Sequence, residues 1–527
     1  MAYSGVFAKI PFGEAGLVTD LPPAATPANA FIFCDNVSFE NGLLEKARGG
    51  LRWNTNALPA GVVSVWDWWP DTVTQRLIAV TSDGSVYRDT GDRLFSGNVA
   101  IASGLGSLTP NTVLVDGGQE TALRAKKLFF FTEGRSQVQV LSGDGTSLAD
   151  IATPAADWTP GSYPKVGLIH RNRLWAFLGQ RSYASNTGDH ENFTSSFLTD
   201  SIFPGEGGEV IGAYVFKGRL FAFKDGGFVY YLDDTAADSA TWFWRKLASN
   251  FGLAAPHGIL DALNDMLAAN TTGTVTSYAA TDALGDIESA DIFRNAKMEQ
   301  FIHKQLNKGG LEQLHALYYP EKKQVFFTYR RSSQLSNDTL VIVDVGNPSP
   351  RIYTQTKGTP QCLALRKDTY GVDRPMYGSY DGYVVLMDRE DRLEATAAYT
   401  MLAQTSAIDF RHIDPNLATT EKHFDSLSVE FVEEGNWNLE VDYYIDGKFV
   451  ETLTFPMFVD PDYLSEFELD EDLLPYPHAK GNTRRLRGTG RSISFVLRQA
   501  GSNQNVQIAG ITVGLRPGTD RQLRRTS

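Results

Sequence analysis

The chain lacks several features that would assign it to a familiar class. Its 527 residues include only two cysteines, Cys34 and Cys362, so a disulfide-rich scaffold is excluded. Both thiols are expected to be buried and reduced, although closure of the fold by an N-terminal strand would let them approach. No run of eighteen apolar residues occurs, and residues 1–5 do not begin a basic-then-apolar signal sequence. The sequence therefore predicts neither stable membrane insertion nor export through a signal peptide.

Motifs for catalysis are missing as well. There is no HExxH zinc motif, no GxSxG elbow, no phosphate-binding P-loop and no Cys/His cluster, and the eight histidines show no ligand spacing. We therefore expect no enzyme activity, no metal and no cofactor. The paired carboxylates of a glycan-cleaving site would have to come from residues such as Asp225, Asp233, Asp381 and Asp388, most of which stand in expected turns.

What the sequence does contain is a long repeat. Seven times an apolar run meets a short Gly/Asp/Asn turn and a second β-type run, and the repeats begin 45 to 58 residues apart, at positions 77, 128, 173, 219, 266, 324 and 376. A four-stranded propeller blade takes about 40 to 50 residues. The spacing predicts an all-β chain with a β-propeller of six to eight blades, about seven, over residues 61–394. The alternative is a two-sheet sandwich with long hairpins, which the regular period disfavours.

A propeller must close its ring, and a strand from one terminus usually does this. The N-terminal segment, residues 1–60, offers two apolar runs for this purpose, 31–33 and 37–39, just before the turn at Asn41 and Gly42. We expect one of these runs to complete the last blade.

The repeat stops after Glu394, and residues 395–527 are predicted to form a separate β-sandwich, or platform, domain. Its expected strands cover residues 427–432, 437–445, 449–455, 492–498 and 506–515, with a hairpin at Asp446 and Gly447.

Charge in this domain is segregated along the chain. Residues 421–472 hold sixteen acidic side chains and two lysines, whereas ten basic side chains and one aspartate follow from Lys480 onward. The two groups could neutralise each other within one molecule. Alternatively, an acidic face of one subunit could meet a basic rim of the next. The candidate interface residues are Arg484, Arg485, Arg487, Arg491, Arg521, Arg524 and Arg525; residues 521–527 are read as an arm that orders on a partner.

Three stretches resemble a known family. Residues 34–50 (CDNVSFENGLLEKARGG) resemble the opening of bacteriophage tail hub or nozzle proteins, the group that includes tail tubular protein B and phage stabilisation proteins. Residues 298–344 and 488–513 look similar to a blade and to the closing hairpin of the same family. The first stretch departs from the pattern at Ala47, where a basic residue is expected before Arg48.

The resemblance implies a structural virion protein. In such nozzles six copies form a tube below the portal and adaptor rings of a short-tailed phage, tail fibres or spikes attach, and duplex DNA passes through the channel during ejection. Synthesis would take place in the host cytoplasm and the final location would be the virion tail. The net charge of −14 suits a channel that must not hold the phosphates it transmits. Two other classes remain open: a carbohydrate-binding or polysaccharide-degrading propeller, and a generic scaffolding propeller.

Overall fold

The protein is all-β, as predicted, and its strands form many small sheets. The computed structural model describes residues 6–12, 15–40, 42–89, 91, 93–119, 126–143, 145–194, 201–248, 252–278, 291–347, 350–432, 435–458 and 480–518. The few helices are short: α1 (Phe95–Asn98), α3 (Ile292–Asn295), α4 (Glu299–Gln305) and the 3-10 turns η1 (Ser239–Thr241), η3 (Lys308–Gln313), η4 (Pro320–Lys322) and η5 (Pro415–Ala418). Within the described residues no helix is long and apolar enough to cross a membrane.

Between Val62 and Arg389 the described chain builds seven successive groups of three or four antiparallel strands. Each group combines apolar runs with the tight turns seen in the sequence. The strands are, group by group, β6 (Val62–Trp68), β7 (Arg76–Thr81), β8 (Val86–Asp89); β9 (Val113–Gln119), β10 (Lys126–Phe131), β11 (Gln139–Leu141), β12 (Leu148–Asp150); β13 (Val166–His170), β14 (Arg173–Leu178), β15 (Arg181–Ala184); β16 (Val210–Phe216), β17 (Arg219–Lys224), β18 (Phe228–Asp233), β19 (Phe243–Ala248); β20 (Ile259–Ala262), β21 (Asp265–Ala269), β22 (Val275–Ser277); β23 (Ala316–Tyr319), β24 (Gln324–Tyr329), β25 (Thr339–Asp344), β26 (Arg351–Gln355); and β27 (Pro360–Lys367), β28 (Asp373–Ser379), β29 (Val384–Arg389).

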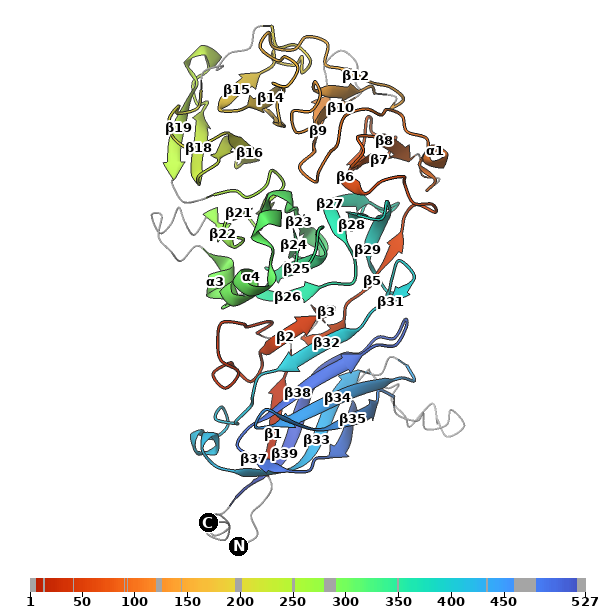
Figure 1. Cartoon of the computed structure of the whole chain (residues 1–527), viewed down its shortest axis with the longest axis vertical. Helices are drawn as coiled ribbons and strands as arrows, with labels where there is room; N and C mark the ends of the chain where they lie inside the picture. The colour runs from red at the N-terminus through yellow and green to blue at the C-terminus, as the bar shows by residue number, and fades with distance from the viewer. Residues whose placement is uncertain are drawn as a thin grey trace, which may run out of the picture.

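These seven groups form a closed circle, which we call the ring. The first strand of each group contacts the first strand of the next, and β27 of the last group contacts β6 of the first. Figure 1 shows the groups around a common centre in the upper part of the molecule. Separate apolar clusters fill the spaces between neighbours: Trp68 and Phe130 lie in one between the first two groups, and Val62 and Met376 in one between the first and last. Face-to-face burial of this kind stabilises sheets that could not bury both faces alone.

The strand at the edge of the last group is not one of those expected. It is β5 (Gly49–Arg52), which pairs antiparallel with β29. The run at 31–33 belongs to β2 (Phe31–Asp35), which pairs with β32 (Met401–Thr405) and makes one parallel bridge to β26. The run at 37–39 belongs to β3 (Val37–Glu40), which folds back onto β4 (Leu43–Lys46). The expectation is wrong because a hydrophobic pattern does not indicate β5, which begins with two glycines that carry no hydrophobic signal.

Below the ring lie two large sheets, which we call the C-terminal sheets, and one of them is continuous with β23–β26 of the ring through β2 (Figure 1). They are not built from residues 395–527 alone, because β1 (Val6–Pro11), β2, β3 and β4 are part of them. The remaining strands of these sheets are β32, β33 (Lys422–Val432), β34 (Asn438–Ile445), β35 (Lys448–Pro456), β36 (Lys480–Arg485), β37 (Thr489–Gly490), β38 (Ile493–Gln499) and β39 (Gln507–Pro517), whereas β30 (Leu393–Glu394) and β31 (Ala397–Ala398) extend the sheet of the last ring group beyond β5. The N-terminal segment therefore joins the ring to the C-terminal sheets.

The two cysteines do not meet. Cys34 lies on β2 and Cys362 on β27, and both are free and buried. Burial raises the pKa of both thiols, that of Cys362 to about 12, so neither is a reactive thiolate at neutral pH.

Candidate functional site

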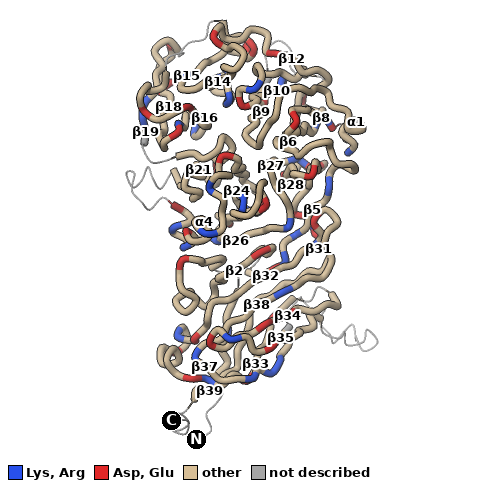
Figure 2. The backbone as a smooth tube through the Cα atoms, in the orientation of Figure 1, with Lys and Arg blue, Asp and Glu red and all other residues tan. Residues whose placement is uncertain are grey.

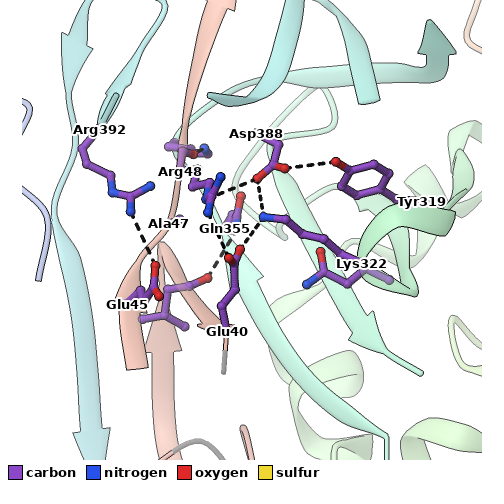
Figure 3. A network of polar contacts seen from close by, with 12 residues as sticks. Glu40, Glu45, Ala47, Arg48, Tyr319, Lys322, Gln355, Asp388 and Arg392 are labelled. Atoms are coloured by element: carbon purple, nitrogen blue, oxygen red, sulfur yellow. Dashed lines mark hydrogen bonds and ion pairs between the residues drawn. The ribbon is translucent and has the colours of Figure 1, made fainter. Parts of the chain in front are cut away.

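Residues 34–50, the stretch that carries the family resemblance, take part in a dense ion network at the junction of the ring and the C-terminal sheets (Figure 3). Arg48 donates to Glu40 at 3.1 Å, and Lys322 pairs with Asp388 at 2.6 Å and also with Glu40. These four side chains are between 13% and 30% exposed. Two cations and two carboxylates thus connect β3, the segment after β4, η4 and β29.

The same network continues into the protein through groups that are almost completely buried. Arg392 lies 3.5 Å from Glu45, and Lys357 lies 3.2 Å from Glu394 in β30. Glu394 also accepts a hydrogen bond from the Tyr377 hydroxyl at 2.6 Å, and burial beside this carboxylate raises the tyrosine's pKa. Because a buried charge is costly unless it is paired, the Arg392–Glu45 pair must form when the N-terminal segment docks.

Ala47 follows Lys46 at the position where the resemblance to nozzle proteins implies a basic residue. Both are completely buried. The Lys46 ammonium donates to the carbonyl of Gly501 at 2.8 Å and lies 4.8 Å from the centre of the Tyr399 ring. Burial, together with nearby Arg392, lowers the pKa of Lys46 to about 8. A second cation at position 47 would add another buried positive charge to this environment.

The arginines predicted to form an interface do not behave alike. Arg484 is held within the molecule, since its Nε donates to the Thr454 carbonyl at 3.0 Å. Arg485, Arg487 and Arg491 are exposed, and in the described part of the chain their side chains form no ion pair. Arg521, Arg524 and Arg525 lie outside the described residues, as do the acidic side chains of residues 460–472.

Part of the segregated charge is neutralised locally. Arg498 pairs with Asp442 at 2.8 Å, and Arg516 pairs with Asp425 at 2.6 Å. Figure 2 shows acidic and basic residues intermingled over the C-terminal sheets. The intramolecular alternative therefore holds for these pairs, and among the predicted arginines that the structure describes, Arg485, Arg487 and Arg491 keep the exposure expected of a rim.

The carboxylates considered for glycan cleavage are not brought together as a pair. Asp225 and Asp381 stand in the turns before β18 and β29, on different groups of the ring. Asp233 pairs with Arg245 at 2.7 Å, and Asp388 pairs with Lys322. Across the described ranges, no cluster of three or more His, Cys, Asp or Glu side chains has metal-binding geometry.

Sequence reasoning missed a pair of histidines inside the ring. The rings of His257 and His315 stack with centroids 4.0 Å apart. His257 Nε2 lies 3.0 Å from the carbonyl of Thr112, just before β9, and the amide of Leu363 on β27 donates to His315 Nδ1 at 3.3 Å. Four groups of strands therefore meet at these two imidazoles, those that begin with β9, β20, β23 and β27. Only the sequence position of each histidine, just before a first strand, could have pointed to them.

This pair should make the fold acid-sensitive. Burial lowers the pKa of both histidines below 6.5, so the unfolded chain binds protons first as pH falls. The contribution of the two neutral histidines to the free energy of unfolding is fully present above pH 6.5. Below pH 6.5 it decreases by about 1 kcal/mol per histidine for each pH unit. We expect the urea midpoint to fall between pH 7.5 and 5.5, and the double variant His257→Gln, His315→Asn, which keeps both hydrogen-bonding atoms, to lose less. His303→Gln, at an exposed position, is the matched control; equal pH dependence in all three proteins would contradict the expectation.

No family model matches the chain, and no curated protein matches it. Solved structures similar to it include the computationally designed Ika8 protein, with a TM-score of 0.36 and 10% identity over 72% of this chain and 99% of that one. Another is the Cps50 (Swd1) beta-propeller domain of Myceliophteria thermophila, with a TM-score of 0.38 and 12% identity over 63% of this chain and 98% of that one.

Proposed function

We propose that the ring is a seven-bladed β-propeller and that the C-terminal sheets form a sandwich-like platform beneath it. Support comes from the cyclic contacts between first strands, from the apolar clusters between neighbouring groups and from β5 at the edge of the last group. In this architecture β5 supplies the fourth strand of the last blade.

We further propose that the protein is a structural component of a virion, the tail nozzle of a short-tailed bacteriophage, and not an enzyme. One observation carries this proposal. The stretch that resembles nozzle proteins, residues 34–50, contributes strands to the ring and to both C-terminal sheets, and its charged side chains are buried where they meet. Such a joint fixes the ring rigidly on its platform, which suits a protein that must transmit force within an assembly.

The proposed partners follow from the same role. Six copies would form a tube, adaptor or portal proteins would lie above it, and fibres or spikes would attach to it. Duplex DNA would pass without being held, because the net charge of −14 disfavours retention of phosphates. The protein would be made in the host cytoplasm and end in the virion tail.

Negative-stain imaging and sedimentation of the purified chain test this proposal. We expect oligomeric rings or short tubes of about six copies. These oligomers should retain DNA only weakly and in a salt-sensitive way. If the chain stays monomeric at high concentration and binds or cleaves a polysaccharide, the proposal is wrong and the protein is a carbohydrate-binding or polysaccharide-degrading propeller.

The three free arginines give a sharper test of the interface. Reversal of Arg485, Arg487 and Arg491 to glutamate is expected to prevent the assembly of copies into an oligomer. The free energy of folding should change by only about 0.5 kcal/mol, because exposed substitutions rarely cost more. Arg484 is left unchanged because it bonds Thr454 within the molecule.

The control for this triple variant reverses Lys217, Arg219 and Lys304, which are exposed on the ring. Assembly is scored by sedimentation velocity and folding by thermal unfolding. If oligomers assemble normally with all three arginines reversed, these side chains do not belong to the interface between subunits.

A further inference from the structure

An exposed apolar knob lies on one flank of the C-terminal sheets. Phe449 and Val450 of β35 are 57% and 39% exposed, and among the described residues no other two consecutive large apolar side chains are both exposed. The Tyr444 ring packs edge-on against Phe449, with centroids 5.6 Å apart. Single exposed apolar residues are ordinary, but neighbouring ones that pack together indicate a contact surface.

The backbone of β35 favours contact through these side chains over strand addition. Tyr443 pairs with Glu451 and Tyr444 with Phe449, so Val450 is an extra residue that forms a bulge. A bulge redirects a side chain and discourages another strand from pairing with the edge. We call Tyr444, Phe449 and Val450 the knob.

An apolar groove of about 430 Å³ lies between the end of β1, residues 24–29 and residues 406–412. Its walls are tied together, because the Ala407 amide donates to the Pro23 carbonyl at 3.1 Å and the Ser406 hydroxyl donates to the Pro27 carbonyl at 3.2 Å. This volume falls in the range of pockets that bury a ligand or an anchoring side chain. We call it the groove.

Knob and groove lie on opposite flanks of the same sheets. In Figure 1, β35 is at the right of the C-terminal sheets, whereas the loop before β2, which forms one wall of the groove, is at the left. Two different surfaces on opposite flanks cannot meet within one molecule. Repeated between copies, their contact would be heterologous, which produces a ring when the rotation closes.

The charges beside the two surfaces are complementary. Glu451, next to the knob, is exposed and forms no ion pair with any residue of the described chain. The rim of the groove carries His412 and Arg411, whose side chain is 57% exposed while it pairs with Asp409. Asp409 also lines the groove, so the exposed guanidinium of Arg411 is the basic group that the acidic side chain beside the knob would meet, which would set the register of the contact.

We propose that Phe449 and Val450 of one copy insert into the groove of the next copy, so that copies join head to tail. This inference rests on the proposed function, a ring of identical subunits, and adds which surfaces join. The occupant is a second copy because each molecule carries one knob and one groove of matching chemistry on its two flanks.

Cysteine cross-linking tests the contact directly. The two native cysteines are 1% and 0% exposed, so thiols introduced at the surface are the ones that react. The variant Val450→Cys, Ala28→Cys places one thiol on the knob and one in the groove. Mild oxidation of the assembled protein should give a ladder of covalent oligomers on a denaturing gel, whereas either single variant should give none.

Self-association provides a second measurement. Replacing Phe449 by aspartate should weaken assembly at least about tenfold by sedimentation, as expected for an anchoring aromatic side chain. Leu335→Asp, at a 92% exposed position on the ring, is the control and should assemble normally. Thermal unfolding of both variants should match that of the unchanged protein.

Each contrary result has a distinct meaning. Dimers from Val450→Cys alone would mean that knob meets knob and would overturn the head-to-tail contact. If oligomers form but the double cysteine variant gives no ladder of covalent oligomers, this inference is wrong, whereas the proposed function is not contradicted. A chain that is monomeric under all conditions would overturn both, and normal assembly of Phe449→Asp would exclude the knob.

Discussion

Replacing Gly49 with valine is expected to open the ring. In β5 the backbone of Gly49 passes so close to the next segment that a β-carbon would lie 2.2 Å from the Leu393 carbonyl oxygen and 2.7 Å from that of Asp391. Both contacts are with backbone, so neither can be relieved by a side-chain rotation. The β5 strand must then leave its place between β29 and β30, and we expect a loss of more than about 3 kcal/mol, above the usual cost of overpacking.

Urea unfolding measures that loss, and limited proteolysis shows where the chain opens. New cleavage near residues 46–54 is expected if β5 is released. The control is Gly481→Val in the edge strand β36, where a β-carbon would meet only the Ser428 hydroxyl, at 3.4 Å. If both variants are equally stable, β5 does not fasten the ring.

The repeat in the sequence predicted the strands of the ring because each run both buries apolar side chains and ends in a tight turn. Residues 77–80 fall in β7 and residues 219–223 in β17, each followed by its expected partner strand. The pattern says nothing of which distant strand completes a sheet. The pairing of β5 depends on the absence of side chains at Gly49 and Gly50, and the placement of β1 to β4 depends on contacts hundreds of residues away.

The candidate site was only partly visible in the sequence. The basic residues after Lys480 were evident, but proximity along the chain does not show that Arg498 and Arg516 pair with acidic residues of neighbouring strands while Arg485 forms no ion pair with any described residue. The ion network was harder to foresee. Its one local signal is Glu45 and Lys46 between Leu44 and Ala47, charges inside an apolar run whose partners, Arg392 and the Gly501 carbonyl, lie hundreds of residues away in the sequence.

Lys357→Met is expected to destabilise the protein by about 3 to 5 kcal/mol, the cost of breaking a buried ion pair from one side. Lys357 and Glu394 are 7% and 5% exposed and lie 3.2 Å apart. Without the ammonium, Glu394 keeps the hydrogen bond from Tyr377 but loses the cation beside it. Thermal and urea unfolding measure the loss.

The double variant Lys357→Met, Glu394→Gln distinguishes a charge effect from a packing effect. Glutamine retains an acceptor for the Tyr377 hydroxyl and removes the buried charge, so the double variant should recover most of the stability. A deficit that is not relieved in the double variant would mean that Lys357 acts through packing against Tyr399, whose ring centre lies 5.3 Å from its ammonium.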